Sequence, residues 1–117
     1  WRPYCHVVDL ARSCILILES DKEKVSQNVY GVGSTKENYT KKMIVDEILK
    51  LVPNSKIKYV QKDEDPRNYR VDFSKIQNEL NFNITKLVPD GLAEIYFTLI
   101  NGFFKDPFDR KFNNLGK

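Results

Sequence analysis

With 117 residues the chain has the length of one domain, and its 41% hydrophobic and 30% charged residues are typical of a soluble globular protein. The net charge of +3 is small and both signs are mixed along the chain, so nothing in the composition favours nucleic-acid binding. No apolar run is long enough to cross a membrane and no signal-peptide pattern opens the chain, which makes the cytoplasm the expected location.

The chain opens on Trp1-Arg2-Pro3-Tyr4 without a Met or a linker, and we expect it to be part of a larger sequence. A short strand is predicted over residues 4–7 and a helix over about residues 8–19. Apolar residues at helical spacing predict the buried face of this helix: Val7, Leu10, Ala11, Cys14, Ile17 and Leu18. We expect Cys14 to be a buried reduced thiol. A disulfide or a metal pair with Cys5 is the alternative, although no second Cys/His cluster completes a site.

Short strands and one helix are predicted in the middle of the chain. Residues 28–33 alternate enough for a strand, and their two glycines suggest the close approach of another backbone. Thr40 is the expected N-cap of a helix that runs to about Val52. Its buried stripe would consist of Ile44, Ile48, Leu51 and Val52. Residues 56–60 alternate polar and apolar side chains, which is typical of a half-buried strand.

Two more helices are predicted after an exposed acidic loop at residues 63–65. Asp72 can cap the first, a short helix. Its apolar face would carry Phe73, Ile76 and Leu80. The second spans about residues 89–101, with Gly102 as its stop signal. The side chains predicted to point inward are Leu92, Ile95, Tyr96, Leu99, Ile100 and Phe103. Three or four helices alternating with three short strands indicate the α/β class.

No complete set of catalytic residues can be recognised. Gly31-Val32-Gly33 lacks the third glycine of a phosphate-binding loop, and we interpret the pair as a strand kink. No Tyr is followed by a Lys four positions later, and His6, the single histidine, forms no recognisable triad with the scattered serines. Metal ligands are not clustered either. We therefore expect that this chain is not a catalyst by its own residues.

Two arginine-containing segments are the candidates for ligand binding. Arg2 stands at the mouth of the first predicted strand, and Arg67 and Arg70 flank Tyr69. The planar guanidinium suits bidentate recognition of phosphate, and a neighbouring aromatic ring could pack against a base or a sugar. The alternative is that the arginines are solvated, or that they pair with Asp63, Glu64 and Asp65.

Three segments, in order, carry a family resemblance. Residues 2–11 are similar to the pattern R-x-Y-x-H-V-x-D-L-A, and residues 30–40 to a strand and helix start of the type N-V-G-S-x-x-x-x-T. Residues 65–76 resemble D-P-R-x-Y-x-x-D-x-S-K-I, and an E-L-x-F stretch follows at residues 79–82. Together they resemble the extended short-chain dehydrogenase/reductase family, which includes nucleotide-sugar epimerases, 4,6-dehydratases and decarboxylases. The agreement extends to about residue 101.

The resemblance implies the carboxy-terminal, substrate-binding region of such an enzyme: a small α/β subdomain over residues 1–104, with an irregular tail over residues 105–117. By resemblance, Arg2 and Arg67 contact the substrate diphosphate, with Arg70 as the other candidate for the second arginine. Tyr69 would line the nucleotide pocket. The motif residues His6 and Asp9 are interpreted as structural, Asp9 as a helix-start residue.

The family's glycine-rich cofactor loop and its Tyr-x-x-x-Lys pair have no counterpart in the chain. The resemblance therefore assigns NAD(P) to a missing amino-terminal Rossmann half, and we expect the chain itself to bind no cofactor and no metal. The expected partners are a nucleotide-diphosphate sugar and that missing half, with a homodimeric parent left open. The alternative is a noncatalytic interaction domain or a small anion-binding module.

Overall fold

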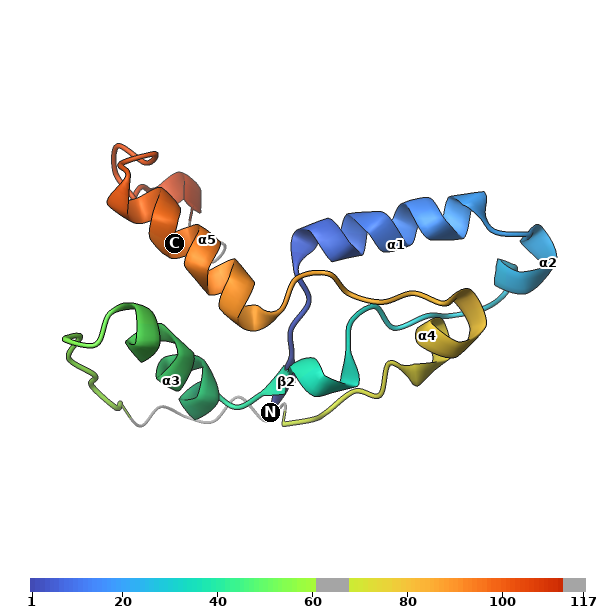
Figure 1. Ribbon diagram of the computed structural model, residues 1–117, viewed down its shortest axis with the longest axis horizontal. Helices are drawn as coiled ribbons and strands as arrows, with labels where there is room; N and C mark the ends of the chain where they lie inside the picture. The colour runs from blue at the N-terminus through green and yellow to red at the C-terminus, as the bar shows by residue number, and fades with distance from the viewer. Residues whose placement is uncertain (61–67, 113–117) are drawn as a thin grey trace.

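A computed structural model describes residues 1–60 and 68–112 of the chain. In these residues five α-helices and a two-stranded antiparallel sheet form a small mixed α/β arrangement, which agrees with the expected class (Figure 1). The strands are β1 (Arg2–Pro3) and β2 (Asn38–Tyr39), with Arg2 opposite Tyr39. The helices are α1 (Val7–Glu19), α2 (Lys22–Val25), α3 (Lys41–Leu51), α4 (Ser74–Leu80) and α5 (Val88–Ile100). Two short 3₁₀ helices are η1 (Thr35–Glu37) and η2 (Arg110–Phe112).

The small sheet lies between two groups of helices. In Figure 1, α1, α2 and α4 lie on one side of it, and α3 and α5 lie on the other, where they contact each other. The arrangement is open. The radius of gyration is 17.3 Å, where about 13 Å is expected for a compact domain of this length. The accessible surface is 9870 Å², where about 6,600 Å² is expected for a folded monomer of 13.7 kDa.

The apolar core is correspondingly small. Among the described residues, the buried apolar side chains are Phe73, Ile76 and Phe82. The ring of Phe73 packs on the segment that contains Gly31 and Gly33. A Cβ at Gly33 would lie only 2.9 Å from the Phe73 ring, so this position requires glycine. The predicted close approach at these glycines is therefore made by an aromatic ring and not, as we expected, by another backbone.

Polar side chains hold distant segments together, one of them the buried Asn38. The Asn38 side chain donates to the carbonyl of Val71 at 2.9 Å and accepts from the Val71 N–H at 3.0 Å. The Thr35 hydroxyl accepts from the Phe73 N–H and donates to the Asp72 carboxylate, both at 3.0 Å. These bonds place residues 71–73 beside η1 and β2.

The Asp9 side chain connects α1 to a segment that is distant in the sequence. Its carboxylate is fully buried and accepts hydrogen bonds from the backbone N–H groups of Thr85 (3.0 Å) and Lys86 (2.9 Å) and from the Thr85 hydroxyl (2.8 Å). Arg12 pairs with it at 2.6 Å. Burial raises the pKa of Asp9, but the hydrogen bonds from Lys86, Thr85 and Arg12 outweigh burial and hold the pKa below its ordinary value. Asp9 is thus in the first turn of its helix, as predicted, and also anchors the chain that leads into α5.

The predicted helix boundaries are confirmed, except for the cap residue of α4. Thr40 caps α3 by accepting from the Met43 N–H at 3.2 Å. The N-cap position of α4 is Phe73 and not, as predicted, Asp72, although the Asp72 carboxylate accepts from the Ser74 N–H at 2.9 Å. Gly102 follows α5 with a positive φ of 67°, the conformation expected of a helix stop. The polar stretch before residue 28 contains the short helix α2, and the tail contains η2.

The predicted strands are wrong in position. The strand expected over residues 4–7 lies at residues 2–3, and residue 7 already begins α1. Residues 28–33 and 56–60 form no ladder with any described residue. Alternation indicates that a segment can be half-buried in a sheet, but a ladder also needs a partner strand, and none of the described segments supplies one.

The predicted inward face of α1 is also wrong. Asp9 and Ser13, four residues apart, form the buried side of the helix. Most of the apolar stripe faces outward, with Val7 71% and Leu18 85% exposed. Cys14 lies on this outward side, and both cysteines are free and exposed, so the expected buried thiol is wrong. Helical spacing identifies residues that share a face, but not the face that contacts the rest of the chain.

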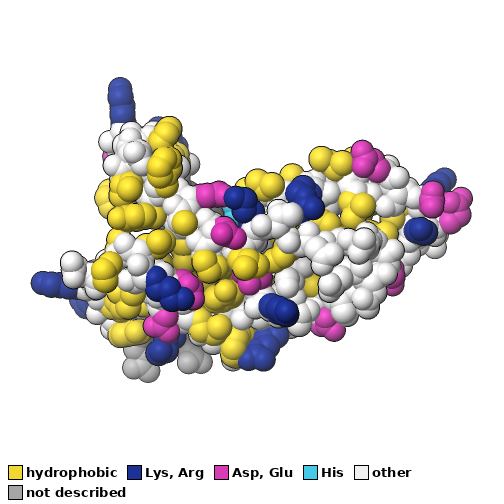
Figure 2. Space-filling view, in the orientation of Figure 1, with side chains coloured by type: hydrophobic (Ala, Val, Ile, Leu, Met, Phe, Trp, Pro, Cys, Tyr) yellow, Lys and Arg dark blue, Asp and Glu magenta, His cyan; other side chains and the backbone are white. Residues whose placement is uncertain are grey.

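In α3 and α5, too, some of the apolar residues that were predicted to be buried are exposed. In α3 the predicted stripe is half-buried except for Ile48, which is exposed. In α5, Leu92 and Tyr96 are half-buried. The other predicted inward residues are exposed: Ile95, Leu99, Ile100 and Phe103. Apolar side chains gather over α5 and the segment after it, at the upper left of Figure 2.

Candidate functional site

The two arginine segments meet in space. The Tyr69 N–H donates to the carbonyl of Trp1 at 3.4 Å, and Trp1 N donates to the Asn68 side chain at 2.5 Å. The Arg2 guanidinium lies 5.5 Å from the centre of the Tyr69 ring, and the Arg70 guanidinium lies 3.5 Å from the Trp1 ring. We call Trp1, Arg2, Tyr69 and Arg70 the aromatic–arginine cluster. Each segment contributes one ring and one arginine, and each arginine lies over the ring of the other segment.

The fold explains why these residues meet. Arg2 is in β1, which pairs with β2, and β2 carries Asn38, whose side chain holds Val71. The residues just before Val71 therefore run past the start of β1. The Arg2 side chain also donates to the carbonyl of Trp1 at 3.0 Å, which fixes the guanidinium near this crossing.

A groove of about 470 Å³ lies beside the cluster, within the size range of small-molecule sites. It places Lys36 and Arg70 on the same surface as Asp72. Hydrogen bonds from Ser74 and Thr35 lower the pKa of Asp72, so this carboxylate is ionised at neutral pH and is engaged in holding the fold. The residues that line the groove are Trp1, Thr35, Lys36, Asn38, Met43, Arg70, Val71 and Asp72.

Three of the predicted site residues are thus brought together: Arg2, Tyr69 and Arg70. Arg67, and the acidic residues 63–65 that were its alternative partners, lie outside the described residues. Sequence reasoning missed Trp1 and Lys36. The signal for Trp1 was its position next to Arg2, whereas Lys36 is recognisable only from its place in the groove.

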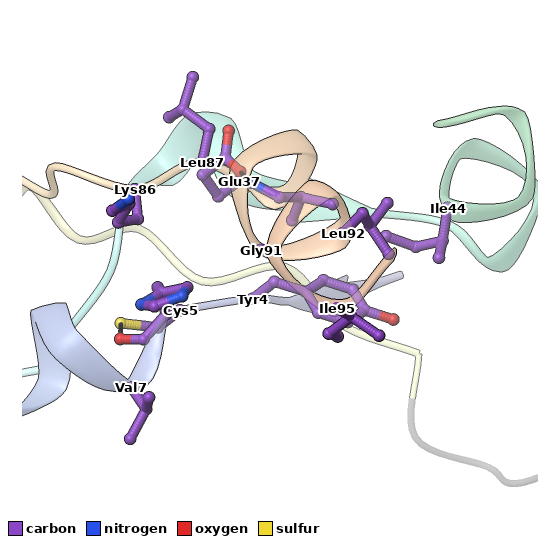
Figure 3. A pocket seen from close by; sticks show the side chains of 12 residues that line it. Tyr4, Cys5, Val7, Glu37, Ile44, Lys86, Leu87, Gly91, Leu92 and Ile95 are labelled. Atoms are coloured by element: carbon purple, nitrogen blue, oxygen red, sulfur yellow. Dashed lines mark hydrogen bonds between the residues drawn. The ribbon is translucent and has the colours of Figure 1, made fainter. Parts of the chain in front are cut away.

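A second, more apolar pocket of about 310 Å³ lies between the start of α1 and α5 (Figure 3). Leu92 and Ile95 of α5 and Ile44 of α3 contribute to its apolar wall. At its edge His6 caps α1, because its Nδ1 accepts from the Val8 N–H at 3.2 Å. This leaves Nε2 as the protonated nitrogen, which donates to Glu94 at 3.1 Å. Both ring nitrogens of His6 thus have hydrogen-bond partners within the chain, which fits the structural role expected from the sequence.

The neighbouring thiol is not an activated nucleophile. Burial, together with the nearby charge of Asp9, raises the pKa of the Cys5 thiol. The Cys5 sulfur lies 3.5 Å from the backbone carbonyl of His6, and both ring nitrogens of His6 already have partners. The pocket therefore offers an apolar surface and a neutral thiol, and His6 cannot serve Cys5 as a base in this arrangement.

The Phe73 ring packs against Gly31 and Gly33 on the side where a Cβ would project, so these glycines make room for an aromatic side chain. The described residues contain no group of three or more His, Cys, Asp or Glu side chains suited to a metal ion. None of the helices in the described ranges has the length and apolarity needed to span a membrane.

Comparisons with known proteins identify no relative: no protein-family model, no curated protein and no solved structure matches this chain. The resemblance to extended short-chain dehydrogenases thus rests on the three segments of the chain itself.

Proposed function

We propose that this chain is the substrate-binding portion of an NAD(P)-dependent nucleotide-sugar epimerase or dehydratase, and that the aromatic–arginine cluster binds the substrate diphosphate. The observation that carries this proposal is the meeting of Arg2 with Tyr69 and Arg70, which lie in the first and last of the three family-like segments. Those are the segments to which the resemblance assigns phosphate contact.

The chemistry of the cluster supports a phosphorylated ligand. A guanidinium stacked on a ring keeps its N–H donors in the plane of the group, where they can bind two oxygens of one phosphate. Lys36 and Arg70 add positive charge along the groove, and the groove has room for part of a nucleoside beside the phosphates. Arg67 remains a candidate for a further phosphate contact.

The open surface supports a missing partner half. The outward face of α1 is apolar, and a soluble monomer rarely exposes a contiguous apolar patch of more than a few hundred Å². Residues 28–33 form neither a helix nor a ladder with any described residue, as expected of a strand whose sheet lies elsewhere. In this proposal the Rossmann half covers both features and supplies NAD(P) together with the catalytic residues.

In this proposal the catalytic half and this chain have different roles in the parent enzyme. The parent enzyme would oxidise a sugar carbon transiently, alter the keto intermediate and return the hydride. This chain would hold the nucleotide end of the substrate and form one wall of the pocket. Binding energy from that remote end would orient the sugar at the reacting centre.

Calorimetric titration of the chain with uridine, thymidine, cytidine and guanosine diphosphate sugars, with NAD alongside, tests the proposal. We expect base-selective binding of one sugar nucleotide that is weakened in Arg2→Ala, and no binding of NAD. The matched control is Arg110→Ala, which removes the same charge from an exposed site in η2. Binding of NAD, or affinity unchanged in Arg2→Ala, would refute the assignment.

A noncatalytic interaction or anion-binding domain is the second candidate. The exposed apolar surface that suits a missing half would also suit a separate protein partner. An anion-binding module would bind inorganic pyrophosphate as tightly as any sugar nucleotide, so a titration with pyrophosphate beside the sugar nucleotides separates it from the proposed function.

A further inference from the structure

Five exposed phenylalanine side chains lie on α5 and on the segment after it. The Phe97 ring contacts the Phe103 ring with 6.3 Å between their centres, and the Phe104 ring contacts the Phe112 ring at 5.0 Å. Phe108 follows Phe104 in the sequence and is 92% exposed. We call these five residues the phenylalanine surface. Apolar side chains gather over this part of the molecule in Figure 2.

The sequence of α5 is that of a helix buried on most of its sides. Its polar side chains, Asp90, Glu94 and Thr98, are four residues apart and therefore form one narrow stripe along the helix. A helix with one solvated face carries a much narrower apolar stripe than this. In the described residues α3 packs against α5, yet Phe97 and Ile100 stay exposed. The side of α5 that carries them is therefore suited to a partner outside the described chain.

This side differs from the surface assigned to the missing half. Ile95 lines the pocket between the start of α1 and α5. Phe97 follows two residues later, about 200° around the helix, and so points away from that pocket. The outward face of α1 and residues 28–33 belong to the other group of helices, and the segment after α5 lies at the opposite end of Figure 1 from α2. A partner on those features leaves the phenylalanine surface open.

The exposed area is close to that of a stable interface. An aromatic side chain has about 150–250 Å² of surface, so at their exposed fractions the five rings leave roughly 600 Å² open. Ile100, which is 62% exposed, adds to this area. A standard interface uses about 800 Å² on each partner, and the interfaces of homodimers are more apolar than those of transient complexes.

The charges beside the rings suit a second copy of the same surface. Lys105, Asp106, Asp109 and Arg110 place both signs within six residues, and Lys111 pairs with Asp109 at 3.1 Å. A membrane surface or a nucleic acid would favour cations alone. In a two-fold dimer each surface faces its own copy, so cations and anions on one copy can meet their opposites on the other.

We infer that the phenylalanine surface is the interface of a two-fold dimer of this chain. The sequence left a homodimer open, and the inference gives it a surface at the end of the molecule away from the face proposed for the Rossmann half. It goes beyond the proposed function and does not depend on the nucleotide sugar.

Sedimentation velocity of the chain over a range of concentrations tests the inference. We expect a dimer at about 100 µM chain and a dissociation constant raised at least tenfold in Phe108→Asp, because the dimer would bury two like charges among the rings. Phe103→Asp probes the end of the surface nearer α5 and should have the same effect. Circular dichroism should show unchanged helix content in both variants, since both side chains are mostly exposed.

The matched control is Leu18→Asp, which places the same charge on the outward face of α1 at a side chain that is 85% exposed. It should leave the dissociation constant of the dimer unchanged. A monomer at all concentrations overturns the inference. So does a dimer that Leu18→Asp weakens as much as either phenylalanine variant does, because the chains would then associate through α1. Oligomers that keep growing with concentration exclude a closed two-fold pair. Neither result changes the expected titration with sugar nucleotides, so the proposed function stands or fails separately.

Discussion

Replacement of Asp9 by alanine should destabilise the fold more than any change on the outward face of α1. The fully buried carboxylate accepts from two backbone N–H groups and one hydroxyl of residues 85 and 86, and it pairs with Arg12. Arg12 keeps other contacts in the variant, since it also donates to the carbonyl of Asn83 at 3.2 Å. The groups that lose their acceptor are therefore the two N–H groups and the Thr85 hydroxyl.

The size of the effect can be worked from these bonds. A buried donor left without its partner costs about 1–3 kcal/mol. Thr85 is exposed as a residue, so water can reach part of this site in the variant and the lower end applies. We expect Asp9→Ala to lower the free energy of unfolding by about 2–4 kcal/mol, out of about 5–15 kcal/mol for a typical domain. Asp9→Asn keeps one acceptor oxygen and should cost about half as much.

Urea denaturation followed by far-ultraviolet circular dichroism measures the effect. The matched control is Asp21→Ala, because Asp21 is exposed and lies 3.8 Å from Lys24 in a surface pair. The control should change the free energy of unfolding by less than about 0.5 kcal/mol. An equally small change in Asp9→Ala would refute the view that this carboxylate anchors the entry to α5.

Three further results are expected. Because the pKa of Asp9 is lowered by folding, its contribution to stability is present above about pH 4 and is lost as the pH falls through the folded pKa, so acid titration of stability should be flatter in Asp9→Asn. Gly33→Ala should lower the melting temperature more than Gly102→Ala, because a Cβ at Gly33 meets the Phe73 ring at 2.9 Å whereas Gly102 has open space; equal shifts would contradict the packing described. Thr40→Ala should cost about 1 kcal/mol in urea denaturation through loss of the α3 cap, and Thr40→Ser should recover most of it.

The helix boundaries were predictable because they depend on local chemistry. Thr40 and Asp72 accept from backbone N–H groups two or three residues ahead, and Gly102 supplies the positive φ after α5. Each of these interactions spans only a few residues. A single sequence contains all the information that such caps require.

The packing faces were not predictable because they depend on the partner of each helix. Asp9 and Ser13 are buried because residues 85 and 86 supply hydrogen-bond donors to Asp9. No sequence pattern near α1 indicates that this distant segment is its partner. The apolar stripe at Val7 and Leu18 has no counterpart among the described residues. The predicted strand at residues 28–33 failed for the same reason, since a ladder needs a second strand.

Part of the residues that line the candidate site could be named from the sequence, but their arrangement in space could not. The motifs named Arg2, Tyr69 and Arg70, and the structure brings them together. That Arg70 stacks on Trp1 follows only from the crossing of two segments far apart in the sequence. Lys36 lines the groove from η1.

The Asn38 side chain has a consequence for how this site could vary among related sequences. Its amide donates to and accepts from the same residue, Val71, as a backbone unit in an antiparallel pair does. One side chain thereby substitutes for a rung of a β-ladder and sets the register of the chain that carries Arg70. Asn38→Leu would remove both hydrogen bonds to Val71 without changing any arginine. The segment that carries Arg70 would then lose the contact that fixes its position along β2.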